Sequence, residues 1–164
     1  MIGSSGVEAS PELRRRLADL YAAYDDALDE GEYERWPDFF TEAGVYKILP
    51  RENYDAGLPV AMVFCESRAM IRDRVVALRE TTLYAPRIVR RVMGAPLLRA
   101  VEGGEMRLGQ SFALFETMLN EPTTVFLSGR CYDRVAEEDG ALKFAERLCV
   151  TDATNIPLSL VFPI

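Results

Sequence analysis

Residues 36–53, WPDFFTEAGVYKILPREN, mark the change from helical to strand character along this chain. The stretch begins with a tryptophan and two phenylalanines, continues as a strand-like run, GVYKIL, and ends at a proline-containing corner. Aromatic residues at such a seam either line a cavity or pack helices onto a sheet. We predict packing, and we place the corner PRENYD, residues 50–55, at a surface or a subunit contact. The packing residues would be Trp36, Phe39, Phe40 and Tyr46.

The segment before this stretch predicts one long helix. Residues 10–12, Ser-Pro-Glu, form a strong helix start: a serine cap, a proline in the first turn and an acid near the positive end of the helix dipole. Leucine and tyrosine residues then recur every three or four positions as far as Leu28, which gives one apolar stripe. Gly31 is suited to ending the helix. A short second helix is expected over residues 35–40, because Pro37 is tolerated only in a first turn.

The rest of the chain predicts one further helix and then strands. A turn-rich loop is expected at residues 50–59 and a helix at residues 67–83. Four long strands with short connections, typical of antiparallel neighbours, should follow. They are expected at residues 88–101, 106–119, 123–135 and 142–152. Helices followed by strands in a meander indicate an α+β fold, in which N-terminal helices pack on a curved antiparallel sheet that forms a cone.

The two ends of the sequence differ in character. Residues 1–9 are expected to form a flexible leader, and residues 10–164 a single domain. The apolar final segment, IPLSLVFPI at residues 156–164, is expected to be tucked into a groove or an interface. The sequence has neither an apolar run long enough to span a membrane nor the hydrophobic core of a signal peptide, so we expect a cytoplasmic protein.

No histidine occurs among the 164 residues. The chain therefore lacks the usual general base near neutral pH and the commonest transition-metal ligand. This excludes a Ser-His-Asp or Cys-His nucleophilic site, a two-histidine, one-carboxylate iron site and a Rieske cluster supplied by this chain. The three cysteines are widely spaced, form no CxxC pattern, and are expected to be buried free thiols.

The net charge of −7 argues against a nucleic-acid-binding protein. The charge is uneven, however: residues 68–99 contain eight arginines and two acidic residues, a local charge of +6. These arginines either pair with acids elsewhere in the fold or form a surface that meets an acidic partner subunit.

Catalysis without histidine would depend on carboxylates and tyrosines. A carboxylate base with a tyrosine donor could transfer protons next to a carbonyl group. The candidates are Tyr21, Tyr24, Tyr46, Glu52 and Asp152. This signal is weak, because tyrosine in a helix stripe is usually core and Glu52 lies in a loop expected to be exposed. The acidic run YDDALDEGEYE lacks the alternating ligand spacing of a calcium loop, and VEGGEM is predicted to be a hairpin turn.

Several segments, taken in order, resemble the small (beta) subunits of aromatic-ring-hydroxylating dioxygenases. The resemblance begins with LYAAYDDALDEGEYERWPDFFTEAGVYKI at residues 20–48 and continues through MIRDRVVALRETTLYAPRIVRRVMG at residues 70–94. SFALFE, VFLSGRCYDRV and LKFAERLCVTDATNIPLSLVFPI follow in the same order. LPRENYDAGLP and the closing IPLSLVFPI are most similar to small subunits whose large partners act on aromatic carboxylates such as benzoate, salicylate, anthranilate or terephthalate.

The resemblance implies an NTF2-like (SnoaL-like) cone and a structural, non-catalytic role. It implies no cofactor or metal in this chain, and a large (alpha) partner subunit that carries a Rieske [2Fe–2S] cluster and mononuclear iron. The expected assembly is a homotrimer that supports a large-subunit trimer, α3β3. Two alternatives from other classes are a stand-alone NTF2-like isomerase or dehydratase and a small-ligand-binding protein.

The resemblance also suggests where subunits would meet. Arginine is favoured where carboxylates are bound across an interface, and the apolar end of the chain would be buried by folding or by assembly. The interface candidates are Arg72, Arg74, Arg87, Arg90, Arg91, Phe162 and Ile164. The sequence departs from the family at Arg91, since many relatives have a histidine after the arginine that corresponds to Arg90.

Overall fold

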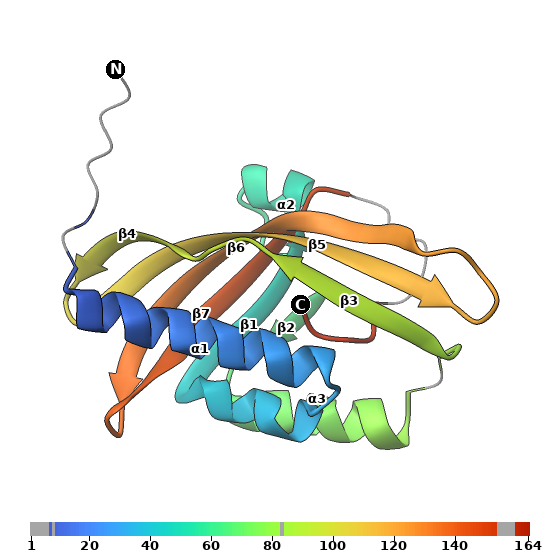
Figure 1. The fold of residues 1–164 in the computed structure, drawn as a ribbon, viewed down its shortest axis with the longest axis horizontal. Coiled ribbons are helices and arrows are strands. Elements are labelled where there is room, and N and C mark those ends of the chain that lie inside the picture. The colour runs from blue at the N-terminus through green and yellow to red at the C-terminus, as the bar shows by residue number, and fades with distance from the viewer. Residues whose placement is uncertain (1–6, 8, 83, 154–159) are drawn as a thin grey trace.

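A seven-stranded sheet curves over the helices in the computed structural model of the chain (Figure 1). The structure describes residues 7, 9–82, 84–153 and 160–164, so most of the expected leader lies outside the described residues. In chain order the elements are α1 (Pro11–Asp29), η1 (Tyr33–Phe39), β1 (Phe40–Pro50), α2 (Arg51–Asp55), β2 (Val63–Cys65), α3 (Arg68–Glu80), β3 (Arg87–Met93), β4 (Leu97–Glu102), β5 (Glu105–Met118), β6 (Thr124–Glu138) and β7 (Ala141–Thr151).

The sheet has the strand order β2-β1-β7-β6-β5-β3, and β4 pairs with the end of β5 that β3 does not reach. The predicted fold class, helices packed on a curved sheet, is confirmed (Figure 1). Among the described strands one pair departs from the antiparallel pattern: β1 runs parallel to β7, with Tyr46 opposite Arg147. The long stretch of chain between these strands allows the crossover that a parallel pair requires.

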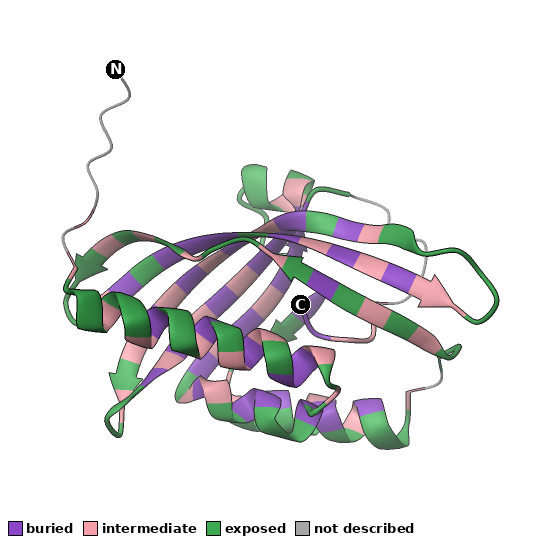
Figure 2. Ribbon diagram, in the orientation of Figure 1, coloured by how far each residue is buried: buried purple, intermediate pink, exposed green. Residues whose placement is uncertain are grey.

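Helix α1 begins and ends as predicted. The Ser10 hydroxyl accepts a hydrogen bond from the Leu13 N–H at 3.1 Å, and Pro11 occupies the first turn. Gly31 follows the helix with φ +73°, a left-handed conformation that glycine adopts at little cost. One face of the helix is buried against the sheet and the opposite face is exposed (Figure 2).

The seam between helix and strand differs in detail from its prediction. Tyr33–Phe39 form a 3₁₀ helix, so the second helix begins earlier than expected, and Phe40 is the first residue of β1. The helix is short, as 3₁₀ helices are, and ends where the Phe40 N–H binds the Pro37 carbonyl. The packing prediction is confirmed, since the four aromatic residues are buried or partly buried: Trp36, Phe39, Phe40 and Tyr46.

Two other predictions of secondary structure need correction. Residues 50–59 are not a continuous loop, because the short helix α2 begins directly after Pro50, and the short strand β2 then adds to the edge of β1. The strand expected at residues 88–101 is divided into β3 and β4. The sequence Gly94-Ala95-Pro96 separates them, and proline has no N–H to continue a ladder.

Gly129, on β6, lies close against the backbone of β7. A Cβ atom at this position would lie 2.1 Å from the Val150 carbonyl oxygen and 2.7 Å from the ring of Phe112. The residue is therefore glycine because any side chain would meet the backbone of the neighbouring strand.

Candidate functional site in the cone interior

The tyrosines predicted as catalytic candidates point into the space between α1 and the sheet. Tyr21, Tyr24 and Tyr46 are almost fully buried. The two carboxylates do not join them: Glu52 is exposed on α2, and Asp152 is exposed beyond β7. Asp152 accepts hydrogen bonds from Arg51 at 2.7 Å and from the Ser128 hydroxyl at 3.1 Å. The structure therefore does not bring either of these candidate carboxylates to the candidate tyrosines.

A different carboxylate lies among the tyrosines. Arg147, on β7, is completely buried and donates to Asp133 Oδ2 at 2.9 Å and to Gln110 Oε1 at 3.0 Å. Asp133 Oδ2 also accepts the Tyr21 hydroxyl at 2.7 Å. Gln110 in turn donates to the Gly94 carbonyl at 3.0 Å. Three neighbouring strands and α1 thus meet in one buried polar cluster.

The aromatic rings around Arg147 favour its charged state. Its guanidinium carbon lies 4.6 Å from the centre of the Tyr24 ring and 5.1 Å from that of Phe144, a geometry that stabilises a cation. Burial lowers the pKa of Arg147, but the charge of Asp133 and other neighbours outweighs it and the net pKa is raised. Burial raises the pKa of Tyr21 and Tyr24 far above neutrality, so both phenols stay protonated. Neither tyrosine is prepared to act as a base.

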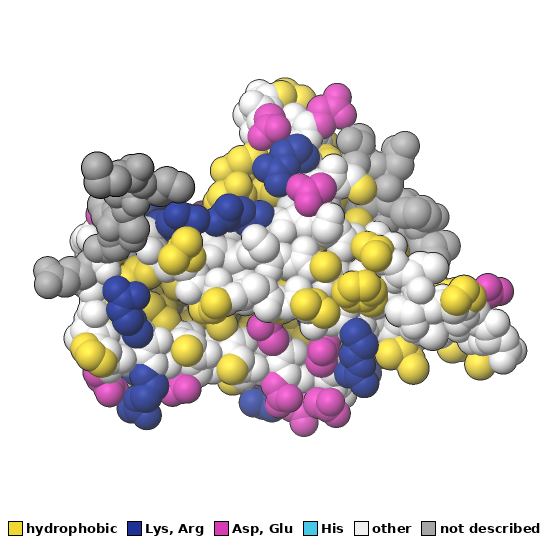
Figure 3. Space-filling view, turned by 45° about the horizontal axis from the view of Figure 1, so that its top comes forward, with side chains coloured by type: hydrophobic (Ala, Val, Ile, Leu, Met, Phe, Trp, Pro, Cys, Tyr) yellow, Lys and Arg dark blue, Asp and Glu magenta, His cyan; other side chains and the backbone are white. Residues whose placement is uncertain are grey.

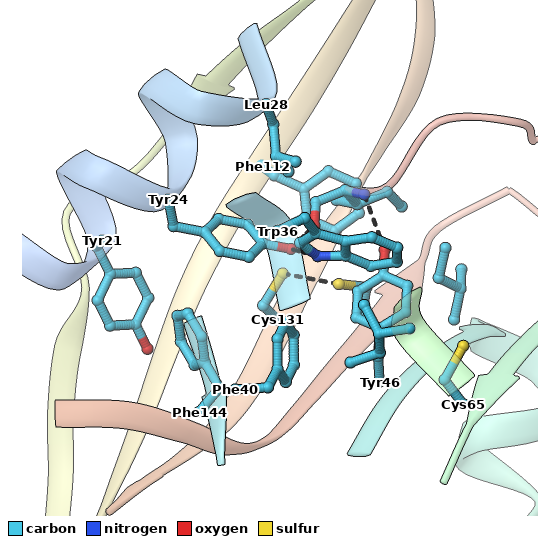
Figure 4. Close-up of a cluster of buried hydrophobic side chains, with 14 of the residues drawn as sticks. Tyr21, Tyr24, Leu28, Trp36, Phe40, Tyr46, Cys65, Phe112, Cys131 and Phe144 are labelled. Carbon is cyan, nitrogen blue, oxygen red and sulfur yellow. Dashed lines mark hydrogen bonds between the residues drawn. The ribbon is translucent and has the colours of Figure 1, made fainter. Parts of the chain in front are cut away.

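The last residue of the sequence occupies the centre of this interior. Ile164 is fully buried; its N–H donates to the Tyr46 hydroxyl and its carbonyl oxygen accepts the Tyr24 hydroxyl, each at 2.8 Å. The Trp36 indole donates to the Tyr24 hydroxyl at 3.1 Å (Figure 4). The Tyr24 hydroxyl therefore connects Trp36 with Ile164. Hollows of 340 to 420 Å³ occur at the surface, and none of these three is lined by the interior tyrosines.

Asp25, on α1, is a further ionisable group at the edge of the cluster. Its Oδ1 atom is buried and has no hydrogen-bond partner among the described residues. Burial raises the pKa of the Asp25 carboxyl to about 6, against the lowering effect of the Arg147 and Arg91 charges. Burial thus moves the pKa of the Asp25 carboxyl toward neutral pH.

Sequence reasoning missed the polar members of the cluster: Asp25, Gln110, Asp133 and Arg147. A signal for two of them was present. Asp133 falls in the same alternating phase as the buried Cys131 and Val135, and Arg147 in the phase of Cys149. A charged residue in the inward phase of a strand indicates a buried partner.

The arginines of residues 68–99 mostly pair within the chain. Five of the eight form ion pairs with acids of this chain: Arg68, Arg72, Arg79, Arg87 and Arg91. This favours the first interpretation of the charge pattern, in which the arginines neutralise acids in their own fold. The subunit-contact role stays a prediction.

The predicted interface residues divide into buried and exposed groups. The buried side chain of Arg87 forms an ion pair with Glu116 at 2.8 Å. The side chain of Arg91 is 1% exposed; it forms an ion pair with Asp29 at 2.9 Å and donates a hydrogen bond to the Pro163 carbonyl at 2.6 Å. Arg72 and Arg90 are exposed, and the partly buried Arg74 donates to the Leu160 carbonyl at 3.3 Å. Of the apolar pair, Phe162 stacks on Tyr33 and Ile164 is buried in the interior. Within the described part of the tail, Pro163 and Ile164 are therefore buried by the chain's own fold, and the residues before them are half-buried.

The described residues contain no group of three or more cysteine and acidic side chains that could hold a metal ion, which fits the lack of histidine in the sequence. No helix of the described part of the chain is long and apolar enough to cross a membrane. The residues present therefore do not fit a Rieske cluster or a mononuclear iron.

The fold and its filled interior define a class: an NTF2-like α+β cone whose centre is packed with side chains. Within this class, residues 25–157 match the family model described as ring hydroxylating beta subunit. The chain belongs to this family, the beta subunits of aromatic-ring-hydroxylating dioxygenases.

Individual relatives agree with the family match. The anthranilate 1,2-dioxygenase small subunit of Burkholderia cepacia is 33% identical over 88% of this chain and 90% of that subunit. A second relative comes from a Comamonas species: subunit beta 2 of the terminal oxygenase component of terephthalate 1,2-dioxygenase. It is 31% identical over 91% of this chain and 97% of that subunit. A crystal structure from Novosphingobium aromaticivorans, assigned as the beta subunit of an aromatic-ring-hydroxylating dioxygenase, has a TM-score of 0.85 and 32% identity, covering 96% of this chain and all of that chain.

Proposed function

We propose that this chain is the structural subunit of an oxygenase that hydroxylates an aromatic carboxylate, and that it stabilises the assembly of the iron-bearing large subunit. The observation that carries the proposal is the filled cone interior, where Ile164 and Arg147 occupy the space between α1 and the sheet. A stand-alone isomerase or dehydratase would need that space for substrate, and its tyrosines would need a nearby base. The family match disfavours that alternative as well.

The substrate class is taken from the relatives. Their names specify anthranilate and terephthalate, which are both aromatic carboxylates. The aromatic ring would bind in the large subunit, since this chain offers no iron ligand set among its described residues and no histidine in its sequence. The choice among benzoate, salicylate, anthranilate and terephthalate would be made there.

The proposed assembly is a homotrimer of this chain joined to three large subunits, α3β3. The large subunits would carry the Rieske [2Fe–2S] cluster and the mononuclear iron. Arg72 and Arg90 are the exposed members of the predicted interface set and are proposed to contact neighbouring subunits of the assembly directly. Arg74, Arg87 and Arg91 would support the contact from inside, by holding the tail and β3 in place.

The test is co-expression of this chain with an iron-bearing large subunit of the same family. We expect a complex whose mass by light scattering equals three copies of each chain, and hydroxylation of an aromatic carboxylate. Within that complex, Tyr21→Phe and Tyr46→Phe should leave the hydroxylation rate per iron within about twofold of wild type, because neither hydroxyl takes part in chemistry. A loss of 100-fold or more, the size typical of a lost acid–base group, with the complex and its iron content intact, would overturn the non-catalytic role.

A further inference from the structure

Two exposed apolar patches stand out on the described surface. The first, here the loop patch, lies in the uncharged run Gly57–Phe64 and consists of Leu58, Val60, Met62 and Phe64. The second, here the hairpin patch, lies on β3 and the β5–β6 hairpin and consists of Ile88, Val92, Leu119 and Val125. Val60 is 64% exposed and Leu119 is 77% exposed. Gathered apolar exposure of this kind marks an interaction surface.

The two patches lie toward opposite ends of the sheet. β2, which carries Phe64, is at one end of the strand order, and β3, which carries Ile88 and Val92, is at the other. Figure 3 shows hydrophobic side chains beside the α2 lobe at the top and along the hairpin at the right. A second copy could therefore bind at each end, one through each patch.

Each patch has exposed apolar side chains next to a hollow. A hollow of about 340 Å³ beside the loop patch is lined mainly by apolar side chains, among them Leu49, Tyr54 and Leu148. At the hairpin patch, Ile88 and Leu119 line a hollow of about 420 Å³, and Leu119 stands at the turn between β5 and β6. Leu119, the most exposed large apolar side chain of the described surface, thus stands at the tip of the β5–β6 hairpin. The apolar hollow beside the loop patch lies toward the opposite end of the sheet.

The charges of the patches are complementary. Three exposed acids, Glu52, Asp55 and Glu66, flank the loop patch and take part in none of the ion pairs found among the described residues. Arg90 lies between Ile88 and Val92 on the same face of β3; it is exposed and in none of these ion pairs, although it donates to the Asp29 backbone carbonyl at 3.3 Å. The hairpin also carries one exposed acid, Glu121, at its tip. Two hairpin patches brought together would oppose arginine with arginine. A hairpin patch on a loop patch would oppose arginine with acid.

We propose that the hairpin patch of one copy binds the loop patch of the next copy, and that three such contacts close the homotrimer. This inference rests on the homotrimer of the proposed function. A contact between two different patches is heterologous, and it produces a closed ring when the rotation between copies closes. Leu119 inserts into the hollow beside α2, and Arg90 meets the acids that flank it.

The experiment measures the mass of the purified chain by light scattering. Wild type should be a trimer, about 55 kDa from three times 18.4 kDa. Val60→Glu and Leu119→Glu each destroy one patch at an exposed position, and each variant alone should be a monomer. An equimolar mixture should form a dimer of about 37 kDa, because it retains one pair of intact patches, one from each variant. A contact between identical patches could not be restored by mixing.

Val76→Glu is the matched control. Val76 is a 52% exposed apolar residue on α3, outside both patches, so this variant should remain trimeric. A wild-type chain that is monomeric or dimeric, or two patch variants that stay trimeric, would overturn the inference. If the patch variants stay trimeric but lose the large subunit, the patches belong to that partner. If the trimer and its mixing behaviour hold but no large subunit binds, the proposed function fails and this contact stands.

Discussion

Arg147 carries its positive charge in an interior that is largely aromatic and aliphatic. Such a charge is tolerated only where carboxylate, amide and ring partners replace water. Asp133 and Gln110 provide the polar contacts, and the Tyr24 ring covers one side. These contacts fix the guanidinium in the place where an open cone would have its cavity.

Removal of Arg147 should therefore be costly. Arg147→Met leaves the Asp133 carboxylate buried without its counter-charge, and we expect a loss of about 3–5 kcal/mol in the free energy of unfolding. Urea denaturation followed by circular dichroism measures this loss. The double variant Arg147→Met/Asp133→Asn removes both charges and should recover part of the stability. A double variant as unstable as the single one would contradict the importance of the pair.

Asp25 gives a pH dependence with a defined sign. Its carboxyl has a pKa of about 6 in the folded chain and 3.8 in the reference state, so folding favours the protonated form. The contribution to stability is complete below pH 3.8 and is lost as the pH rises toward 6. Asp25→Asn should therefore be more stable than wild type above pH 6, by about 3 kcal/mol, and equal to it near pH 3.5. Urea denaturation of both chains at pH 3.5 to 8 measures the difference; a constant difference would exclude this role.

At the residue scale, the sequence predicted the packing residues better than the polar ones. Trp36 and Phe40 were recognised because large aromatics at a helix–strand seam have few other uses. Asp133 and Arg147 were missed because each is stable in the interior only when paired with the other. Strand alternation predicts which face a residue lies on, but not its partner across the sheet.

At the scale of the elements, close backbone packing limits what the strands can carry. Gly129→Ala places a methyl group against the Val150 carbonyl and the Phe112 ring, so β6 and β7 must separate locally. We expect destabilisation of at least about 3 kcal/mol, which thermal unfolding would reveal as a large fall in Tm.

Gly140 provides a control for the glycine prediction. It lies in the β6–β7 turn at φ +78°, and nothing lies within 4 Å of an added Cβ. Gly140→Asn should cost less than about 1 kcal/mol, because asparagine tolerates the left-handed region. Equal losses for the two variants would show that backbone conformation, and not the close approach at Gly129, sets the cost.

The elements were predictable where their periodicity was local. The caps of α1 and the alternation of β5, β6 and β7 could be read from adjacent residues. The division at residues 94–96 carried a signal, the proline, that was not used. The parallel pairing of β1 with β7 carried no local signal, since strand partners far apart in sequence are set by the assembled core.

At the scale of the whole molecule, the uneven charge has two parts. Arginines such as Arg87 and Arg91 neutralise acids of the same chain, while Arg90 remains exposed beside apolar side chains. The sequence alone could not separate these parts, because the separation depends on which acids the fold brings near each arginine. The interior likewise could be assigned as filled only once Ile164 was located between Tyr24 and Tyr46.

The pairing of β1 with β7 also bears on how the chain is made. Tyr46 and Arg147 are 101 positions apart in the sequence, so the first long strand waits for the last before its ladder can form. At about 5–20 residues per second of synthesis, the wait lasts roughly 5–20 s. During that interval the edge of β1 that pairs with β7 has no partner, although β2 can already pair with the opposite edge. A fold with so many distant contacts closes slowly. The nascent chain is thus most exposed to aggregation just before its final strand leaves the ribosome, when a chaperone has the most to protect.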